Sequence, residues 1–155
     1  MITAVDYDQT VIDITKRYFR PICADVLDSM KGKNYQFIVA DAAEYLERAV
    51  KNNLKVDIII NDITTIALTS KSEGDRWDFL RKLLNLSMKV LKDGGVYINH
   101  GTSASRLEGQ KLYEYELNKL DSTIQFTKKI AIIPSYQENW VIYLIWKNIE
   151  KKQRT

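Results

Sequence analysis

The chain has 155 residues, of which 45% are hydrophobic and 28% charged, and its formal net charge is +3. This length is enough for one domain with its own core, and the composition is that of an ordinary globular protein. No apolar run approaches the ~20 residues that a membrane-spanning helix needs. The N-terminus also lacks the basic and apolar regions of a signal peptide.

The basic residues gather in part at the C-terminal end, at Lys147, Lys151, Lys152 and Arg154. We expect residues 1–149 to form one domain and residues 150–155 to be a solvated basic tail, with no nucleic acid as partner. The only cysteine, Cys23, excludes an internal disulfide and fits a reducing compartment, so we expect a cytoplasmic protein. No His or Cys lies near Cys23 in the sequence, and no metal site is expected there.

The first part of the chain alternates predicted strands and helices. Asp8 is a suitable N-cap for the first helix, whose apolar residues have helical spacing, and Pro21 lies beyond its end. Between residues 21 and 33 the pattern is irregular, with one helical turn expected near 24–30. The predicted elements are a strand at Ile2–Val5, a helix at Gln9–Phe19, a strand at Tyr35–Val39 and a helix at Ala42–Lys51.

The run Val56–Ile60 predicts the next strand, and it leads directly into Asn61 and Asp62. Because β-branched residues dominate it without polar alternation, we expect a central parallel strand that is covered on both faces. Ligands of open α/β sheets bind beyond the carboxyl ends of such strands, so Asp62 is a candidate site residue. The alternative is that Asp62 only begins a turn.

The second half contains two helices and three more strands. A polar loop without periodicity, Thr64–Gly74, lies where a substrate-facing loop is expected. The helix at Asp75–Leu91 is the strongest, and Lys92–Gly95 is expected to end it with a glycine C-cap. The other predicted elements are a strand at Val96–Asn99, a helix at Arg106–Leu120 and strands at Ile124–Ile133 and Trp140–Trp146.

Apolar residues mark the inner faces of these two helices. The last two strands have no helix between them, so they are expected to form an antiparallel pair at one edge of the sheet. The pattern as a whole predicts an α/β fold with a mostly parallel sheet. The expected core stripe of the first helix is Trp77, Leu80, Leu84, Met88 and Leu91, and that of the second is Leu107, Leu112, Tyr113, Leu117 and Leu120.

Acidic residues follow three of the predicted parallel strands, namely Asp6 and Asp8, then Asp41, then Asp62. Parallel strands place their carboxyl ends on one side of a sheet, so these acids are expected to converge on one rim. A carboxylate accepts two hydroxyl donors, which suits Asp6 to the diol of a ribose, and Asp41 with Ala42 suits the amino group of an adenine. The alternative for each acid is a helix N-cap.

Other chemistries have little support in the sequence. There is no Walker pattern, no CxxC pair and no glycine-rich phosphate loop. His100 is the only histidine, so a Ser-His-Asp triad would have to be built around it. Ser103 and Ser105 are too close to it in sequence to be persuasive partners, and we do not expect such a triad.

Several segments, taken in order and with their spacing, resemble the catalytic domain of the spermine synthases, within the polyamine aminopropyltransferase family. The resemblance extends over nearly the whole chain. Spermidine synthases usually carry Asp-Ser-Ser/Thr-Asp after the central strand, whereas here the positions after Asp62 are Ile63-Thr64-Thr65, so the spermine branch is favoured. The segments are Val5-Asp6-Tyr7-Asp8-Gln9, Ala40-Asp41-Ala42, Ile60-Asn61-Asp62, Trp77-Asp78-Phe79-Leu80 through Leu91, Pro134-Ser135-Tyr136-Gln137-Glu138-Asn139-Trp140 and the following Val141–Lys147.

The resemblance implies a class I methyltransferase-like, Rossmann-like fold and a reaction. An aminopropyl group would pass from decarboxylated S-adenosylmethionine to spermidine, giving spermine and methylthioadenosine, without a metal or redox cofactor. Asp62 would be the catalytic proton acceptor, and Tyr136 and Glu138 would bind the polyamine. Asp6, Asp8, Asp41 and Ala42 would bind the co-substrate, although Asp6 stands where the family commonly has Glu.

Family members also have an N-terminal dimerisation domain, a small β-domain and a first sheet strand with a glycine-rich turn, which these 155 residues do not contain. The strands ending at Asp6 and Asp62 would normally flank that strand, so they are expected to pair directly, leave a cleft or accept a strand from elsewhere. A second hypothesis is therefore a non-catalytic homologue that acts by association, as a homodimer or with a full-length synthase. A third is a methyltransferase that uses intact S-adenosylmethionine.

Overall fold

The structure, a computed structural model, describes residues 1–63, 65–66, 69 and 71–148. Parts of the predicted loop Thr64–Gly74 and the predicted basic tail at 150–155 lie outside the described residues. The chain divides into two compact units, Met1–Arg48 and Ala49–Thr155.

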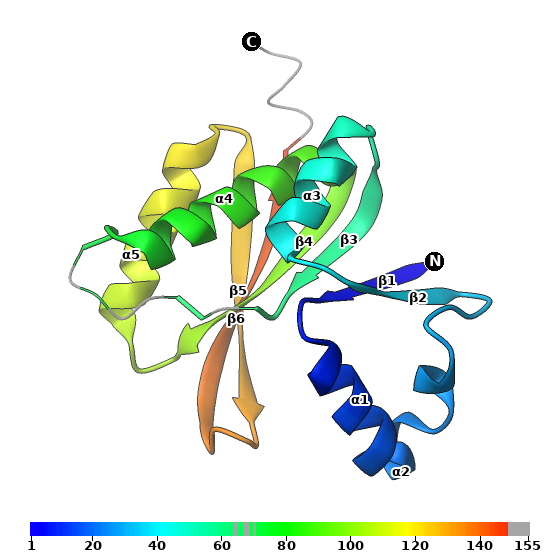
Figure 1. The fold of residues 1–155 in the computed structure, drawn as a ribbon. Helices are drawn as coiled ribbons and strands as arrows, with labels where there is room; N and C mark the ends of the chain where they lie inside the picture. The colour runs from blue at the N-terminus through cyan, green and yellow to red at the C-terminus, as the bar shows by residue number, and fades with distance from the viewer. Residues whose placement is uncertain (64, 67–68, 70, 149–155) are drawn as a thin grey trace. The chain divides into compact units, whose positions relative to one another are not determined.

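The first unit is built on a parallel pair of strands, β1 (Ile2–Asp6) and β2 (Tyr35–Val39), which run in register from Ile2↔Tyr35 to Asp6↔Val39. Helix α1 (Gln9–Tyr18) follows β1, and the Asp8 carboxylate caps it by accepting the Thr10 N–H at 2.8 Å. The sequence between 19 and 34 forms the short helix α2 (Arg20–Cys23) and a 3-10 turn at Val26–Asp28. Both strands and α1 thus lie where the sequence predicts them (Figure 1).

Helix α3 (Ala42–Lys51) follows β2 and crosses the boundary between the units. Asp41 caps it, because its Oδ1 accepts the Glu44 N–H at 2.9 Å. The predicted bounds of this helix are confirmed. Asp41 is also one of the candidate ligand-binding residues. The alternative role predicted for it, a helix N-cap, is therefore present in the structure.

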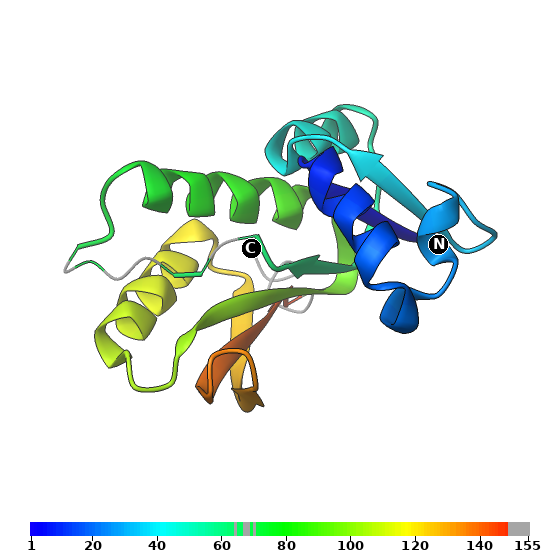
Figure 2. The ribbon, with the colours of Figure 1, turned by 60° about the horizontal axis from the view of Figure 1, so that its bottom comes forward.

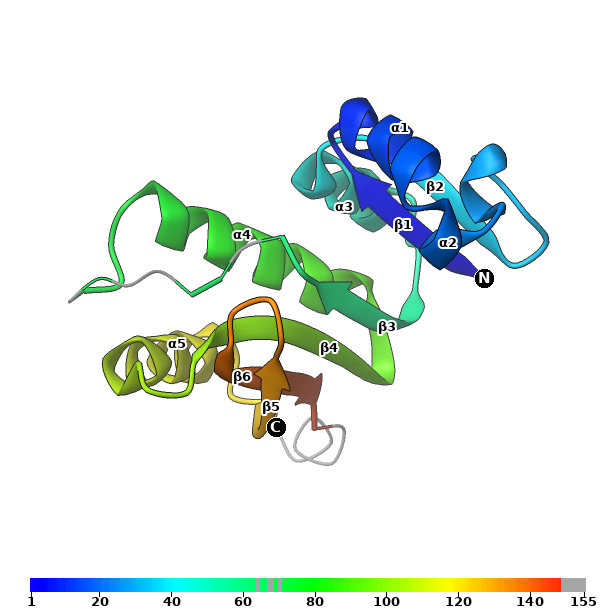
Figure 3. The same ribbon diagram turned by 90° about the horizontal axis from the view of Figure 1, so that it is seen from below.

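The second unit contains a four-stranded sheet in the order β3-β4-β6-β5, which can be followed in Figure 3. Its strands are β3 (Val56–Asn61), β4 (Leu91–Ser103), β5 (Ile124–Ile133) and β6 (Glu138–Lys147). β3 and β4 are parallel, whereas β6 is antiparallel to both β4 and β5. The predicted antiparallel pair at one edge of the sheet is confirmed.

Two helices, α4 (Asp75–Val90) and α5 (Leu107–Leu120), cover one face of this sheet (Figure 2). Their apolar residues pack against alternate side chains of β4 and β6, among them Tyr97 and Tyr143, which are 1% and 0% exposed. The predicted stripe of α4 is buried as expected. In α5 the prediction is wrong for Leu107, which is 62% exposed because it is the first residue of the helix and lies outside the packed turns.

The prediction that Val56–Ile60 is covered on both faces is wrong. β3 stands at the end of the strand order, and its Ile58 and Ile60 side chains are 61% and 72% exposed. Helices α4 and α5 form the core cluster of this unit with the sheet, and the Ile58 and Ile60 side chains are not part of that cluster. The strands β1 and β3, for which a direct pairing was one expectation, belong to separate sheets.

The expected glycine C-cap after α4 is also wrong. The helix ends at Val90, and strand β4 begins at Leu91, which already has extended backbone angles. Lys92–Gly95 instead form an irregularity in the pairing with β3, between Val56↔Leu91 and Ile58↔Val96. A Cβ on Gly95 would lie 2.7 Å from the Asp57 carbonyl oxygen, so the close approach of the two strands requires glycine there.

No helix within the described part of the chain combines the length and the apolar character needed to cross a bilayer. Within the same residues no three side chains of His, Cys, Asp or Glu are grouped so that they could hold a metal ion.

Candidate functional site

Asp62 stands directly after β3, and the residue before it holds this strand end in place. Asn61 is 5% exposed, and its side-chain Nδ2 donates to Oδ1 of Asn99 on β4 at 2.8 Å. Its own Oδ1 accepts the N–H of Ile63 at 3.3 Å. The backbone is therefore tied on both sides of Asp62, whose side chain is 81% exposed and faces solvent.

His100 on β4 lies next to Asp62, with 3.5 Å between the imidazole Nδ1 and the Asp62 Oδ1. The imidazole stacks on Trp140, with ring centroids 4.5 Å apart and ring planes 8° from parallel. Tyr136, in the turn between β5 and β6, packs on the same indole with a centroid distance of 4.6 Å. Asp62 and Tyr136, far apart in the sequence, thus meet at one aromatic cluster formed by His100, Trp140 and Tyr136 itself.

Glu138 joins this region through a serine. The Ser103 hydroxyl donates to the Glu138 Oε2 at 2.7 Å, and it also lies 2.9 Å from the Ser105 hydroxyl. Ser103 is opposite Trp140 in the pairing of β4 with β6. Since side chains two residues apart on a strand share a face, Glu138 and Trp140 lie on the same side of β6.

A bulge in β4 brings His100 and Ser103 to this same side. His100 pairs with Ile142 and Thr102 with Val141, so Gly101 is the extra residue between them. In a regular strand two residues three positions apart point to opposite faces, and one inserted residue reverses this. A Cβ on Gly101 would lie 2.5 Å from the Val141 carbonyl oxygen, which explains the glycine at this point.

The layer beneath the site is neutral. Burial raises the pKa of Tyr97 far above the ordinary range of a phenol, while a hydrogen bond involving Asn61 partly opposes this effect. Burial likewise raises the pKa of Tyr113, on α5. Both phenols therefore stay uncharged, and the charged groups of the site, Asp62 and Glu138, lie at the surface.

The remaining predicted site residues are in the first unit, at the carboxyl ends of β1 and β2. Asp6 is opposite Val39, and its backbone carbonyl accepts the N–H of Ala40 at 2.9 Å, which places Asp6 and Asp41 at one edge of this strand pair. Asp6 Oδ1 accepts the Asp8 N–H at 2.9 Å. Asp8 and Asp41 cap helices through one carboxylate oxygen each, and Ala42 is the first residue of α3.

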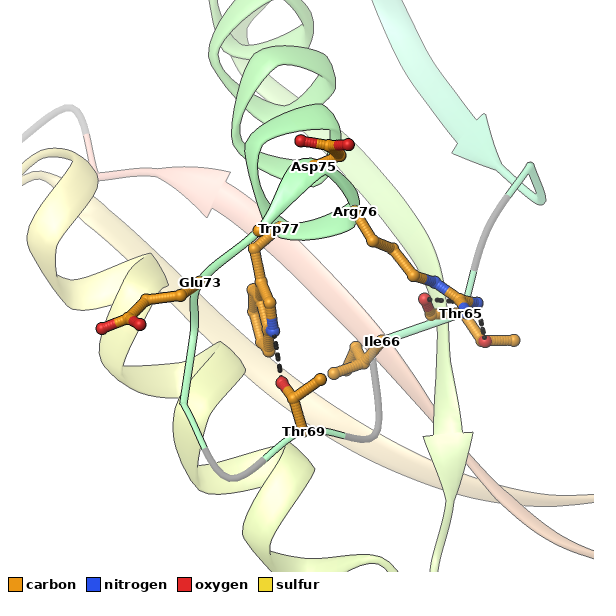
Figure 4. A pocket seen from close by; sticks show the side chains of 8 residues that line it. Thr65, Ile66, Thr69, Glu73, Asp75, Arg76 and Trp77 are labelled. Carbon is orange, nitrogen blue, oxygen red and sulfur yellow. Dashed lines mark hydrogen bonds between the residues drawn. The ribbon is translucent and has the colours of Figure 1, made fainter.

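A pocket of about 340 Å³ lies elsewhere in the second unit, at the N-terminus of α4 (Figure 4). Arg76 donates to the Thr65 hydroxyl at 2.9 Å, and the Trp77 indole N–H donates to the Thr69 hydroxyl at 2.8 Å. None of the site residues predicted from sequence lines it. The lining residues are Thr65, Ile66, Thr69, Glu73, Gly74, Asp75, Arg76 and Trp77.

Three residues of the site were not predicted from the sequence as site residues, namely His100, Ser103 and Trp140. A signal for His100 exists, because it directly follows the predicted strand Val96–Asn99, much as Asn61 and Asp62 follow the predicted strand Val56–Ile60. Ser103 had no such signal, since the predicted strand ended at Asn99 whereas β4 continues to Ser103.

Comparison with known proteins identifies the family of this chain. The family model described as the spermine/spermidine synthase domain matches residues 1–154. The chain belongs to the spermine/spermidine synthase family. This confirms the resemblance to the polyamine aminopropyltransferases that the motifs around Asp6, Asp41, Asp62 and Tyr136 indicated.

Two curated relatives in the spermine/spermidine synthase family carry the name polyamine aminopropyltransferase. The protein of Pyrobaculum islandicum is 27% identical over 143 residues, which are 89% of this chain and 46% of that protein. The protein of Pyrobaculum arsenaticum is 26% identical over 94 residues, which are 61% of this chain and 30% of that protein. The chain thus spans less than half the length of either relative.

Solved structures agree with the family assignment at the level of the fold. A probable spermidine synthase from Corynebacterium glutamicum superposes with a TM-score of 0.57 at 18% identity, over 94% of this chain and 46% of that chain. Human methyltransferase-like protein 13 in complex with SAH superposes with a TM-score of 0.64 at 14% identity, over 96% and 62%. The predicted α/β, methyltransferase-like fold class is confirmed.

Proposed function

We propose that this chain takes part in polyamine aminopropyl transfer, in which decarboxylated S-adenosylmethionine donates an aminopropyl group to spermidine. The products are spermine and methylthioadenosine. The observation that carries the proposal is the gathering of Asp62, Tyr136 and Glu138 at one surface, in a chain that the spermine/spermidine synthase domain matches over residues 1–154. In the proposed site, Asp62 is the acid for the amine nucleophile, Tyr136 is part of an aromatic wall, and Glu138 is a second acid.

The chemistry needs a base more than it needs an activated electrophile. The carbon attached to a sulfonium is already electrophilic, whereas an alkylamine with a pKa of about 10 is mostly protonated at neutral pH. In the proposed step the amine nitrogen forms the new N–C bond, the C–S bond breaks, and its electron pair neutralises the sulfonium. The proton released from the nitrogen passes to the Asp62 carboxylate, a general-base role.

His100 supports this role of Asp62 by its position. Its ring orientation is set by the stack on Trp140, and its Nδ1 lies 3.5 Å from the carboxylate. An imidazole held in this way limits the orientations of an acid that is otherwise exposed to solvent. The atoms that are to accept the proton are thus kept at the end of β3.

The acceptor is a flexible polycation, so its site needs separated anions and an apolar wall for the methylene groups. Glu138 supplies one anion, and the rings of Tyr136 and Trp140 supply the wall. The residues Ile63-Thr64-Thr65 after Asp62 are the reason for proposing spermidine as the acceptor in place of the shorter diamine putrescine.

For the donor we propose the acids of the first unit. Asp6 is assigned to the ribose diol, with Asp8 beside it, and Asp41 with Ala42 to the adenine amino group. Each of these carboxylates has a second oxygen besides the one that caps or bonds the backbone. The proposed reaction requires neither a metal nor a redox cofactor, and the unpaired Cys23 fits a cytoplasmic setting.

The test is product analysis with the 155-residue chain, decarboxylated S-adenosylmethionine and either spermidine or putrescine. We expect spermine and an equal amount of methylthioadenosine. Asp62→Asn should lower kcat by about 10² to 10⁴, the usual contribution of a general base, with little change in KM. The matched control is Asp57→Asn, which changes an acid on the same strand whose partner is Lys92 and should leave kcat unchanged.

Other outcomes contradict the proposal in distinct ways. Methylation of the acceptor from intact S-adenosylmethionine, with no product from the decarboxylated donor, would identify a methyltransferase. No turnover, together with co-elution with a full-length synthase or a homodimer in size-exclusion chromatography, would indicate a non-catalytic partner. Equal losses in Asp62→Asn and Asp57→Asn would remove the special role of Asp62.

A further inference from the structure

Ser103 is a buried serine whose hydroxyl and backbone carbonyl both make hydrogen bonds. Ser103 is 6% exposed. Its backbone carbonyl accepts hydrogen bonds from the Arg106 N–H at 3.0 Å and from the side-chain Nε2 of Gln110 at 3.4 Å. Gln110 is itself 4% exposed, on α5. The residue is therefore held from the side of α5, and its hydroxyl points at Glu138 on the neighbouring strand.

The bond from Ser103 to Glu138 is short, at 2.7 Å, as expected for a hydroxyl that donates to an ionised carboxylate. Because Ser103 donates its single proton to Oε2, the neighbouring Ser105 hydroxyl at 2.9 Å becomes the donor to Ser103. A chain of two serines thus ends on one oxygen of Glu138. Among the described residues no partner is found for the other oxygen, Oε1.

We propose that Ser103 is the positioning residue for Glu138, and that it fixes this carboxylate so that Oε1 receives an ammonium group of the polyamine. This inference rests on the proposed function and adds to it the residue that determines how the acceptor is held. Glu138 is exposed and would otherwise sample several rotamers, so ordering it in advance reduces the entropy lost when the cation binds. Ser103 itself does not touch the polyamine.

The location of the pair supports an ammonium ligand. Glu138 shares its face of β6 with Trp140, whose ring packs against both His100 and Tyr136. An ammonium at Oε1 would therefore have aromatic rings beside its methylene groups, the arrangement that linear polyamines require. The bulge at Gly101 is what places Ser103 on this face together with His100.

The test measures spermidine binding to the 155-residue chain by calorimetry. Ser103→Ala is expected to weaken binding about tenfold, which corresponds to about 1.4 kcal/mol. Ser103→Cys, of nearly the same size but with a weak S–H donor, is expected to weaken it to a similar degree and serves if the alanine variant does not fold. The matched control is Ser72→Ala, which removes the same kind of serine–glutamate bond, to Glu116 at 2.8 Å, and should not change spermidine affinity.

A double-mutant cycle separates positioning from a general effect on structure. In a Glu138→Gln background, Ser103→Ala should cause no further loss of spermidine affinity, because its effect acts through the carboxylate. Methylthioadenosine, a neutral ligand, should bind Ser103→Ala and the unchanged chain equally well. An equal loss in both backgrounds, or an equal loss in Ser72→Ala, overturns the inference.

The outcomes also distinguish this inference from the proposed function. Spermine formation that is unaffected by either Ser103 variant leaves the proposed function standing and overturns the role of Ser103. Spermidine binding that depends on Ser103 and Glu138, without any aminopropyl transfer, supports the inference and overturns the proposed reaction. A chain that binds no spermidine contradicts both.

Discussion

Glu116 of α5 should contribute to stability in a pH-dependent way. Its side chain is 11% exposed, and its two oxygens accept from the Ser72 hydroxyl and from Nε of Arg81, both at 2.8 Å. Arg81 in turn belongs to α4, so the carboxylate ties α5 to α4 and to the segment before it. The hydrogen bond from Arg81 is the main cause that lowers the pKa of Glu116 below its ordinary 4.5.

We expect Glu116→Gln to lower the free energy of unfolding by about 2 kcal/mol at pH 7. A hydrogen bond to a charged group is worth roughly 1.5–3 kcal/mol, and the glutamine amide keeps part of the two contacts while losing the charge. Arg81 is 32% exposed, so solvent screening keeps the value at the lower end of that range. For a chain of this size the loss corresponds to a fall in Tm of about 4–8 °C.

The effect should vanish in acid. Because the folded pKa of Glu116 is depressed, its contribution is complete above the ordinary value of 4.5 and is lost as the pH falls through the folded pKa. The difference in Tm between the unchanged protein and Glu116→Gln should therefore be largest near pH 7 and shrink below about pH 4.5. Tryptophan fluorescence is a suitable probe, since all three tryptophans belong to the second unit.

Asp78→Asn is the matched control for this experiment. Asp78 pairs with the same Arg81 at 2.7 Å, but its side chain is 71% exposed, so the variant should cost less than about 1 kcal/mol. A Tm difference for Glu116→Gln that is the same at pH 3 and pH 7 would refute the reasoning. So would a control variant that is as unstable as Glu116→Gln.

Three further substitutions test the packing of the second unit, each by denaturant unfolding. Gly101→Ala should cost about 1–3 kcal/mol, since the new Cβ would lie 2.5 Å from the Val141 carbonyl oxygen; a neutral result would contradict the close approach at the bulge. Trp77→Ala should cost about 3–5 kcal/mol because the indole is 1% exposed, and a loss below 1 kcal/mol would contradict its place in the core. Tyr143→Phe should cost about 1 kcal/mol by removing the bond to Glu114 at 2.9 Å, and a gain in stability would show that this bond is not made.

Local patterns were sufficient wherever local physics decides the structure. The cap at Asp8, the bounds of Tyr35–Val39 and Ala42–Lys51, and the strand Ile124–Ile133 were predicted from residues that lie next to one another. Helix caps, helical spacing and β-branched runs act within a few residues. The same is true of the acids at strand ends, which mark Asp6, Asp41 and Asp62 without any knowledge of the sheet.

The extent of β4 could not be predicted in this way. Lys92–Gly95 has turn-forming residues and is predicted to end the preceding helix, and the predicted strand covers only Val96–Asn99. Pairing with β3 on one side and β6 on the other extends the strand to Leu91–Ser103 despite these glycines. Backbone hydrogen bonds to neighbouring strands outweigh the weak local preference.

The sequence by itself therefore determined the family, the α/β elements and the acids that stand at strand ends, because each can be recognised from residues that are neighbours in the sequence. The tertiary structure alone decided that His100 lies beside Asp62 and that Ser103 bonds to Glu138. The first contact depends on the parallel pairing of β3 with β4, which sets Asn61 opposite Asn99. The second depends on the bulge in β4 and on its antiparallel pairing with β6, a strand that follows it only after a helix and another strand. Such contacts depend on the register between distant strands, which no local pattern encodes.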